Sequence, residues 1–333
     1  MIDFLFRNTV TGALIRASGT VPFDASGVVG EGTWQVATVS PWADNVLTVS
    51  SNRTTHVFLL AGQSNATSRV AFDGGADWPG NVRQWSRSPD NADASFLTSH
   101  DDQVLIPATR PLDHGTQRLP GAMGWALQFS IDYLAQHPDV DLVLVPAARG
   151  GSGFQNNRWN PGNDLFQDAV DRSNALMAAH PDFLFRGILW HQGETDAETA
   201  GDAGAHAAAQ DAMIAALRSG IAAADDSTPF VLGGLAPPWV AGNSNRQTVQ
   251  AGIEDTPNRV AYSSYADSTG LSVFDGIHFD AASMRTLGAR YATALANADQ
   301  NVPDGWQIAD QTIHSYTDVP TPIVVGTTVM EGS

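Results

Sequence analysis

Val57-Phe58-Leu59-Leu60-Ala61 is an unbroken apolar run, and Gly62-Gln63-Ser64-Asn65 follows it directly. A short apolar run that ends at a glycine is typical of a strand buried on both faces of a parallel sheet. Ser64 is therefore predicted to lie at the carboxyl end of a strand, the edge at which an open α/β sheet binds its ligands.

Strand candidates and helical patterns alternate beyond Thr54. Apolar runs recur at 56–61, 140–146, 184–190, 229–235 and 258–263, and residues 81–85 are a further candidate. Helical periodicity fills most of the gaps between them, as where Met284, Leu287 and Tyr291 share one face. Strands joined by helices imply right-handed crossovers. The pattern predicts an α/β fold with a parallel sheet covered by helices on both faces.

Composition divides the chain into three parts. Residues 1–53 are rich in Thr, Val, Ser and Gly in short alternating stretches, which predicts a small β-rich N-terminal appendage. Residues 54–298 form the predicted main domain, and 299–333 a C-terminal extension whose late apolar stretch is a candidate to pack with the appendage. Within the main domain, residues 67–120 hold no clear helix, and their Trp78, Arg110 and His114 are candidates for a substrate-facing loop.

The charge balance excludes several classes of partner. The formal net charge is −18 and the pI is about 4.6, whereas nucleic acid and anionic lipid both need a basic surface. No apolar run is long enough to span a membrane. The first residues lack the basic start and long apolar region of a signal peptide. We expect a soluble protein that binds neither nucleic acid nor membrane; its compartment and its oligomeric state stay open.

Two residue types are absent from the chain. All seventeen basic residues are Arg, which excludes a lysine Schiff base, a phosphate-loop lysine and a Ser-Lys dyad. There is no Cys, which excludes thiolate nucleophiles and Cys-ligated metal. No His-Glu-x-x-His pattern occurs, and His191 with Glu194 is too sparse for a zinc site. We therefore expect neither a metal nor a cofactor.

Asp275-Gly276-Ile277-His278 supplies what a serine nucleophile needs. A serine hydroxyl is nearly inert at neutral pH and requires a base to remove its proton. Asp275 can accept a hydrogen bond from one ring nitrogen of His278 and leave the other nitrogen facing Ser64. The alternative is that Asp275 caps the helix that follows. We predict a catalytic triad of Ser64, Asp275 and His278.

A serine nucleophile also requires donors for the oxyanion that develops. The candidates are the N–H of Ser64, the N–H of Gly151 and the side-chain amide of Gln192. Two alternatives stay open: the turn at Gly150 and Gly151 is merely flexible, and Gln192 is a buried amide that ties two strand ends together. If the turn does supply a donor, it is either Gly150 or Gly151. Further candidates for contact with substrate or for support of the site are Gln63, Asn65, Gly150, Glu194 and Arg149.

Four blocks of the chain together resemble the SGNH hydrolase superfamily. They are Gly62-Gln63-Ser64-Asn65, Gly150-Gly151-Ser152, Trp190-His191-Gln192-Gly193-Glu194-Thr195-Asp196 and Asp275-Gly276-Ile277-His278-Phe279. The Gln-Gly-Glu block is similar to that of the sialate O-acetylesterase-like carbohydrate esterases, which include acetyl xylan esterases. The resemblance implies a flavodoxin-like three-layer αβα sandwich, the triad named above, and an oxyanion hole of Ser64, Gly151 and Gln192.

The expected reaction is removal of small acyl groups, acetyl above all, from carbohydrate through an acyl-enzyme. The sequence after Ser64 lacks the second glycine of the Gly-x-Ser-x-Gly elbow, which disfavours an α/β-hydrolase. Sialic acid would need an arginine for its carboxylate, and Arg110, Arg149 and Arg158 are candidates; neutral acetylated polysaccharide is at least as plausible. The rival interpretation is a non-catalytic carbohydrate-binding or particle-surface protein with an esterase-like fold.

Overall fold

The computed structural model describes residues 53–87, 102–115 and 119–303, together with the backbone of four strands nearer the amino terminus. Those four strands are β1 (Ile2–Asn8), β2 (Leu14–Gly19), β3 (Gly32–Ala37) and β4 (Val46–Val49). They form an antiparallel sheet in the order β2-β1-β3-β4. The predicted appendage and its boundaries as a domain stay a prediction. The C-terminal extension beyond Pro303 lies outside the described residues.

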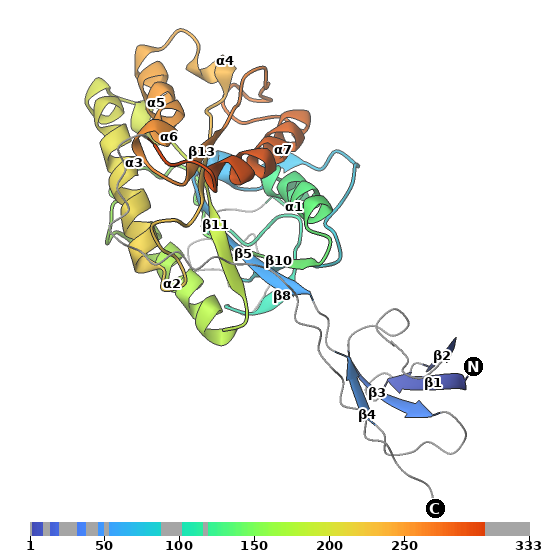
Figure 1. Cartoon of the computed structure of the whole chain (residues 1–333). Coiled ribbons are helices and arrows are strands. Elements are labelled where there is room, and N and C mark those ends of the chain that lie inside the picture. Colours follow the sequence, from blue (N-terminus) through green and yellow to red (C-terminus); the bar gives the residue numbers. More distant parts are fainter. Residues whose placement is uncertain are drawn as a thin grey trace, which may run out of the picture. The chain divides into compact units, whose positions relative to one another are not determined.

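The main domain contains a seven-stranded sheet in the order β13-β12-β11-β5-β10-β7-β8 (Figure 1). Its strands are β5 (Thr54–Gly62), β7 (Val82–Trp85), β8 (Leu105–Pro107), β10 (Val140–Pro146), β11 (Leu184–His191), β12 (Phe230–Gly233) and β13 (Ser263–Ala266). All neighbouring pairs are parallel except β7 with β8. The run β10-β5-β11-β12-β13 has the 2-1-3-4-5 order of flavodoxin-like folds, which confirms the predicted fold class.

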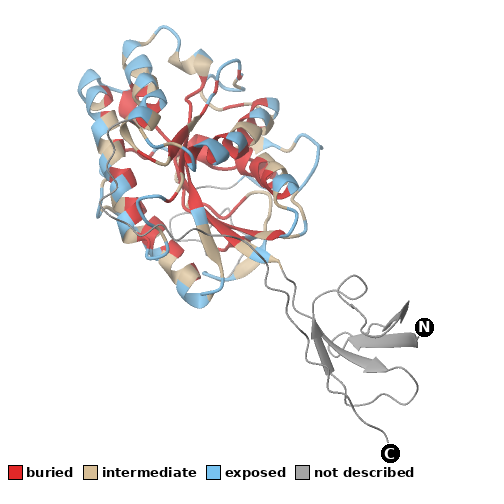
Figure 2. Ribbon diagram, viewed as in Figure 1, coloured by how far each residue is buried: buried red, intermediate tan, exposed pale blue. Residues whose placement is uncertain are grey.

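Helices cover both faces of this sheet. One face carries α1 (Trp125–Gln136) and α7 (Ala281–Ala298); the other carries α2 (Asp164–Ala179), α3 (Ala200–Gly220) and α5 (Ser244–Glu254). The side chains of β5 alternate between the two resulting cores, Phe58 and Leu60 toward one and Val57 and Leu59 toward the other. Figure 2 shows the consequence: the centre of the sheet and the inward sides of the helices are buried, whereas the outward sides of the helices, several loops and some strand ends are exposed.

One strand prediction is wrong. The apolar run at 258–263 does not form a strand, because residues Thr256–Arg259 form the short helix α6 and β13 begins only at Ser263. Pro257 lies at the start of α6, where a missing N–H costs nothing. Tyr262 has a φ of +52°, which no strand residue adopts. The strand can therefore begin only after Tyr262.

Two helices of the main domain begin at residues whose side chains cap them. Thr199 caps α3 by accepting from the N–H of Asp202 at 3.2 Å, ahead of the alanine-rich stretch that favours helix. Asp280 caps α7 by accepting from the N–H of Ser283 at 2.8 Å. The helix cap that the alternative assigned to Asp275 is thus made by Asp280. Across the described part of the chain, none of the helices combines the length and the apolar character needed to cross a membrane.

Candidate active site

Ser64 lies where the strand order of the sheet reverses. The chain leaves β5 for β10 on one side and later returns to β11 on the other, and such a switch point opens a crevice at the carboxyl ends of the strands. Gly62 ends β5 with a φ of +125°, and a Cβ there would lie 2.1 Å from the carbonyl oxygen of His191. Only glycine fits this close crossing. Ser64 then begins the one-turn helix η1 (Ser64–Ala66).

The loop of His278 is closed and turned by its own backbone. Val273 and Phe279 form an isolated bridge at its base, and Gly276 turns the chain at a φ of +95°. Asp275 Oδ1 accepts from the N–H of Ile277 at 3.2 Å and from the N–H of His278 at 2.8 Å. An Asp that accepts from backbone N–H groups two and three residues on stabilises a tight turn. The Asp-Gly-Ile-His spacing therefore holds His278 against Asp275.

Ser64, His278 and Asp275 form a continuous hydrogen-bonded chain. His278 Nδ1 lies 2.7 Å from Asp275 Oδ2, and His278 Nε2 lies 2.9 Å from Ser64 Oγ. An ionised carboxylate only accepts hydrogen bonds, so His278 carries its proton on Nδ1. Its Nε2 is then the acceptor for the Ser64 hydroxyl. This is the arrangement in which a histidine removes a proton from serine.

Asp275 is held in its charged form. Partial burial alone would raise the pKa of its carboxyl, but the hydrogen bonds from the His278 ring and from the N–H groups of His278 and Ile277 outweigh burial. The pKa of Asp275 therefore lies below its ordinary value. In serine hydrolases with this arrangement, a charged carboxylate orients the imidazole and stabilises the imidazolium that forms when the serine loses its proton.

The backbone N–H groups of Ser64 and Gly151 stay the predicted oxyanion donors. Among the described residues, neither the N–H of Ser64 nor that of Gly151 donates a hydrogen bond. Gly151 is exposed and has a φ of +68°, and a Cβ there would meet nothing within 4 Å. Glycine is thus required here for its backbone conformation rather than for space. Gly150 precedes it in the same turn and is half-buried.

Gln192 occupies the position that the second alternative described. The residue is fully buried, and its Nε2 donates to Asp196 Oδ2 at 2.5 Å, with longer contacts to Gln63 Oε1 at 3.3 Å and the Ser152 carbonyl at 3.4 Å. Its Oε1 faces His206 Nε2 at 3.3 Å. The amide therefore ties the ends of β5, β10 and β11 together. A direct oxyanion contact from Gln192 stays a prediction and requires it to exchange partners.

Asp196 supports the glycine turn, and the sequence pattern assigned it no role. Besides Gln192, its carboxylate accepts from the N–H groups of Phe154 at 3.1 Å and Gln155 at 2.7 Å. A Cβ at Gly153 would lie 2.7 Å from Asp196 Oδ2. Burial raises the pKa of Asp196 despite these hydrogen bonds. The signal available in the sequence was its place in the block that also holds Gln192.

The remaining candidates make hydrogen bonds around the site. Gln63 Oε1 accepts from the N–H of Thr195 at 3.1 Å, which links the serine turn to the end of β11. Asn65 and Glu194 are buried and hydrogen-bonded to each other at 2.6 Å. Arg149 is half-buried; its N–H donates to the Gly62 carbonyl at 3.0 Å.

The three residues predicted to lie in a substrate-facing loop make hydrogen bonds or an ion pair within the protein. His114 is buried, and its Nδ1 accepts from the N–H of Ala148 at 3.2 Å, which fixes the chain just before the glycine turn. Trp78 donates through Nε1 to the carbonyl of Thr109 at 3.0 Å. Arg110 pairs with Asp77 at 2.8 Å.

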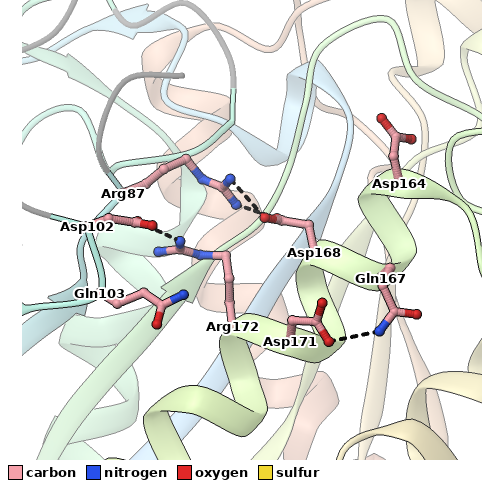
Figure 3. A pocket seen from close by; sticks show the side chains of 8 residues that line it. All are labelled: Arg87, Asp102, Gln103, Asp164, Gln167, Asp168, Asp171 and Arg172. Atoms are coloured by element: carbon pink, nitrogen blue, oxygen red, sulfur yellow. Dashed lines mark hydrogen bonds and ion pairs between the residues drawn. The ribbon is translucent and has the colours of Figure 1, made fainter. Parts of the chain in front are cut away.

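A polar pocket of about 530 Å³ lies along α2, away from the triad (Figure 3). Two ion pairs run across it: Arg87 Nη1 lies 3.0 Å from Asp168 Oδ1, and Arg172 Nη1 lies 3.0 Å from Asp102 Oδ1. Arg172 also donates to the carbonyl of Trp85 at 3.0 Å. None of the described residues that line the pocket is a nucleophile. Its ion pairs attach α2 to the β7 and β8 edge of the sheet.

The sheet order is that of a flavodoxin-like α/β fold, and the contacts among Ser64, His278 and Asp275 are those that the class of serine hydrolases uses. The chain belongs to the carbohydrate esterase family described as sialic acid-specific acetylesterase, which matches residues 54–297. Its members are carboxylic ester hydrolases that act on acetylated carbohydrates. The resemblance of the four blocks is thereby confirmed.

Individual relatives agree with this assignment. A probable 9-O-acetyl-N-acetylneuraminic acid deacetylase of Escherichia coli (strain K12) is 30% identical over 198 residues, which are 49% of this chain and 60% of that protein. The structure of NanS is similar with a TM-score of 0.63 at 20% identity, covering 75% of this chain and 98% of NanS. A carbohydrate acetylesterase from Xanthomonas citri has a TM-score of 0.53 at 19% identity, covering 90% and 69% of the two chains. At these identities the two structures show the fold.

Proposed function

We propose that the protein removes O-acetyl groups from carbohydrate through an acetyl-enzyme on Ser64. The observation that carries the proposal is the unbroken chain from Ser64 Oγ through His278 to Asp275, at 2.9 and 2.7 Å. The rival, a non-catalytic binding protein, has no need for these contacts, one of which joins residues 214 positions apart. Family membership supports the same choice.

The proposed reaction follows from the roles of these groups. His278 Nε2 takes the proton of Ser64 while Oγ attacks the acetyl carbonyl, and the N–H groups of Ser64 and Gly151 stabilise the oxyanion. The imidazolium, paired with Asp275, returns that proton to the sugar oxygen as the C–O bond breaks. Water then attacks the acetyl-serine with the same proton transfers. Acetate and free Ser64 result.

Replacing Asp275 with Asn is expected to lower kcat by about 10⁴. The N–H groups of Ile277 and His278 still need an acceptor, so the new amide turns its oxygen toward them and its NH₂ toward His278 Nδ1. Nδ1 must then accept, which places the ring proton on Nε2, and Nε2 can no longer accept from Ser64. Hydrolysis of 4-nitrophenyl acetate measures the effect. Asp182→Asn, at an exposed turn, is the control, and equal activity of the two variants would contradict the role of Asp275.

Phe274 is expected to contact the sugar. Its side chain is 53% exposed, and its ring centre lies 6.0 Å from that of the His278 imidazole. The apolar C–H face of a sugar ring packs well on an aromatic ring. Phe274→Ala should raise KM for an acetylated oligosaccharide about three- to tenfold and leave turnover of 4-nitrophenyl acetate unchanged. Val302→Ala, which truncates a side chain that is 46% exposed, is the control; an unchanged KM in Phe274→Ala would contradict the contact.

The sugar is determined best by acetate release from a panel. Two of the arginines considered for a sialic acid carboxylate are already paired, Arg110 with Asp77 at 2.8 Å and Arg158 with Asp164 at 2.7 Å. These pairs favour neutral acetylated polysaccharide, whereas the Escherichia coli relative favours 9-O-acetylated sialic acid. Acetylated xylan, O-acetyl sialic acid and acetylated bacterial glycans should be compared by kcat/KM. No acetate release from any of them would sink the proposed function.

A further inference from the structure

Asn65 connects the nucleophile to the loop of the catalytic base. It directly follows Ser64 and is fully buried. Its Nδ2 donates to the carbonyl of Ile277 at 3.2 Å, and its Oδ1 accepts from the N–H of Phe279 at 3.3 Å. The residues on both sides of His278 are therefore attached to the residue next to Ser64. The amide of Asn65 therefore links the turn of Ser64 directly to the loop of His278.

Glu194 supplies the remaining contact of that amide. Glu194 Oε1 accepts from Asn65 Nδ2 at 2.6 Å, the shortest of the three contacts of Asn65. An amide nitrogen has two hydrogens, and the two acceptors, Glu194 and the Ile277 carbonyl, use both. Glu194 lies in the turn after β11, the strand beside β5, so its contact links Asn65 to the neighbouring strand end.

The surroundings of Glu194 are not those of a group that stabilises the fold by charge. Glu194 is 4% exposed, and burial raises its pKa although the hydrogen bond from Asn65 opposes this. His191 Nε2 lies 3.9 Å from Glu194 Oε1, but burial lowers the pKa of His191 to about 3, so the ring is neutral. The nearby Asp196 raises the pKa of Glu194 further. A buried carboxyl without a cationic partner destabilises a protein, which points to a positional role.

We propose that Glu194 is a positioning residue that acts through Asn65 to hold the His278 loop at hydrogen-bonding distance from Ser64. The proposal rests on the proposed function, because it concerns the same triad. Asn65 is fully buried and Glu194 nearly so, which keeps both away from the sugar. Loss of Glu194 should therefore lower kcat and leave KM unchanged.

Two substitutions of similar volume separate acceptor from packing. Glu194→Met removes the acceptor and is expected to lower kcat about 10- to 100-fold, since small displacements of catalytic groups have effects of this size. Glu194→Gln keeps an oxygen that can accept from Asn65, and its kcat should remain within about threefold of wild type. KM should stay within about twofold in both variants. Glu198→Gln, at an exposed acid that follows Glu194 in the same segment, is the control.

A double-mutant cycle tests the route through Asn65. If Glu194 acts through Asn65, the pair Asn65→Ala and Glu194→Met should be no slower than Asn65→Ala alone. Additive losses would overturn the proposal, as would wild-type kcat in Glu194→Met or a raised KM with unchanged kcat. Where Glu194→Met does not fold, Glu194→Asp replaces it. Asp keeps the charge and withdraws the oxygen from Asn65, so full activity in Asp with loss in Gln would overturn the proposal as well.

Labelling of Ser64 by a fluorophosphonate gives a second readout that needs no sugar. Its rate depends on removal of the Ser64 proton by His278, and it should fall in Glu194→Met in proportion to kcat. If the wild-type protein reacts with the probe but releases no acetate, the proposed function is contradicted. The role of Glu194 is then tested by the labelling rate alone. An unchanged labelling rate in Glu194→Met would overturn the role of Glu194 alone.

Discussion

Ser64→Ala is expected to lower kcat for acetyl esters by about 10⁶. Without Oγ there is no atom to form the acetyl-enzyme, and His278 Nε2, now 2.9 Å from where Oγ lay, has no proton to accept. What remains is attack by water on an ester held by the oxyanion donors, worth about 10³–10⁴ over the uncatalysed reaction. The fold should be unaffected, because Ser64 Oγ makes no other hydrogen bond in the described structure.

The measurement is acetate release together with thermal unfolding of each variant. Ser219→Ala removes a hydroxyl from an exposed position at the end of α3, and it should retain full activity. Ser64→Ala with substantial turnover and an unchanged melting temperature would show that another group attacks the ester.

His278→Ala is expected to reduce kcat by a similar factor, about 10⁶. Ser64 keeps its hydroxyl but loses the base 2.9 Å from Oγ, and a hydroxyl near its ordinary pKa is a poor nucleophile at pH 7. The double variant with Ser64→Ala should be no slower than either single variant, because residues that act as a unit are not additive.

Rescue by added imidazole is the sharpest check on this role. The His278 side chain is 12% exposed and that of Asp275 38% exposed, so a small base can enter from solvent and pair with Asp275. Turnover of 4-nitrophenyl acetate by His278→Ala should rise with imidazole concentration, while Ser64→Ala should show no enzyme-dependent rise. His180→Ala, at the end of α2, is the control. High activity in His278→Ala without imidazole would rule out His278 as the base.

The fold class could be predicted because its determinants are local. The run at 140–146 matches β10 residue for residue, since a strand buried on both faces is apolar along most of its length, and only the half-buried Asp141 interrupts this one. The failure at 258–263 has an equally local cause, a Thr-Pro helix start and the positive φ of Tyr262. Apolar content alone cannot detect a backbone conformation of that kind.

The candidate site was predictable only in part. The Asp275 and His278 contact follows from a spacing of three residues and one glycine turn. Partners distant in sequence were harder: Gln192 and Asp196 meet the glycine turn in a buried network, and the pattern of a Gln-Gly-Glu block does not reveal which atoms that amide contacts. Asp280 rather than Asp275 caps α7, which only the register of the helix decides.

By itself, the sequence determined which chemical groups are present, where most of the strands lie and in which turn the histidine meets its aspartate. Each of these depends on residues close together in the chain, through the period of apolar side chains and the backbone angles of glycine. Only the tertiary structure decided that His278 contacts Ser64, that the Gln192 side chain is buried, and that Glu194 accepts a hydrogen bond from Asn65. Those contacts join residues 129 to 214 positions apart, and they form only when the packing of both sheet faces brings the strand ends together.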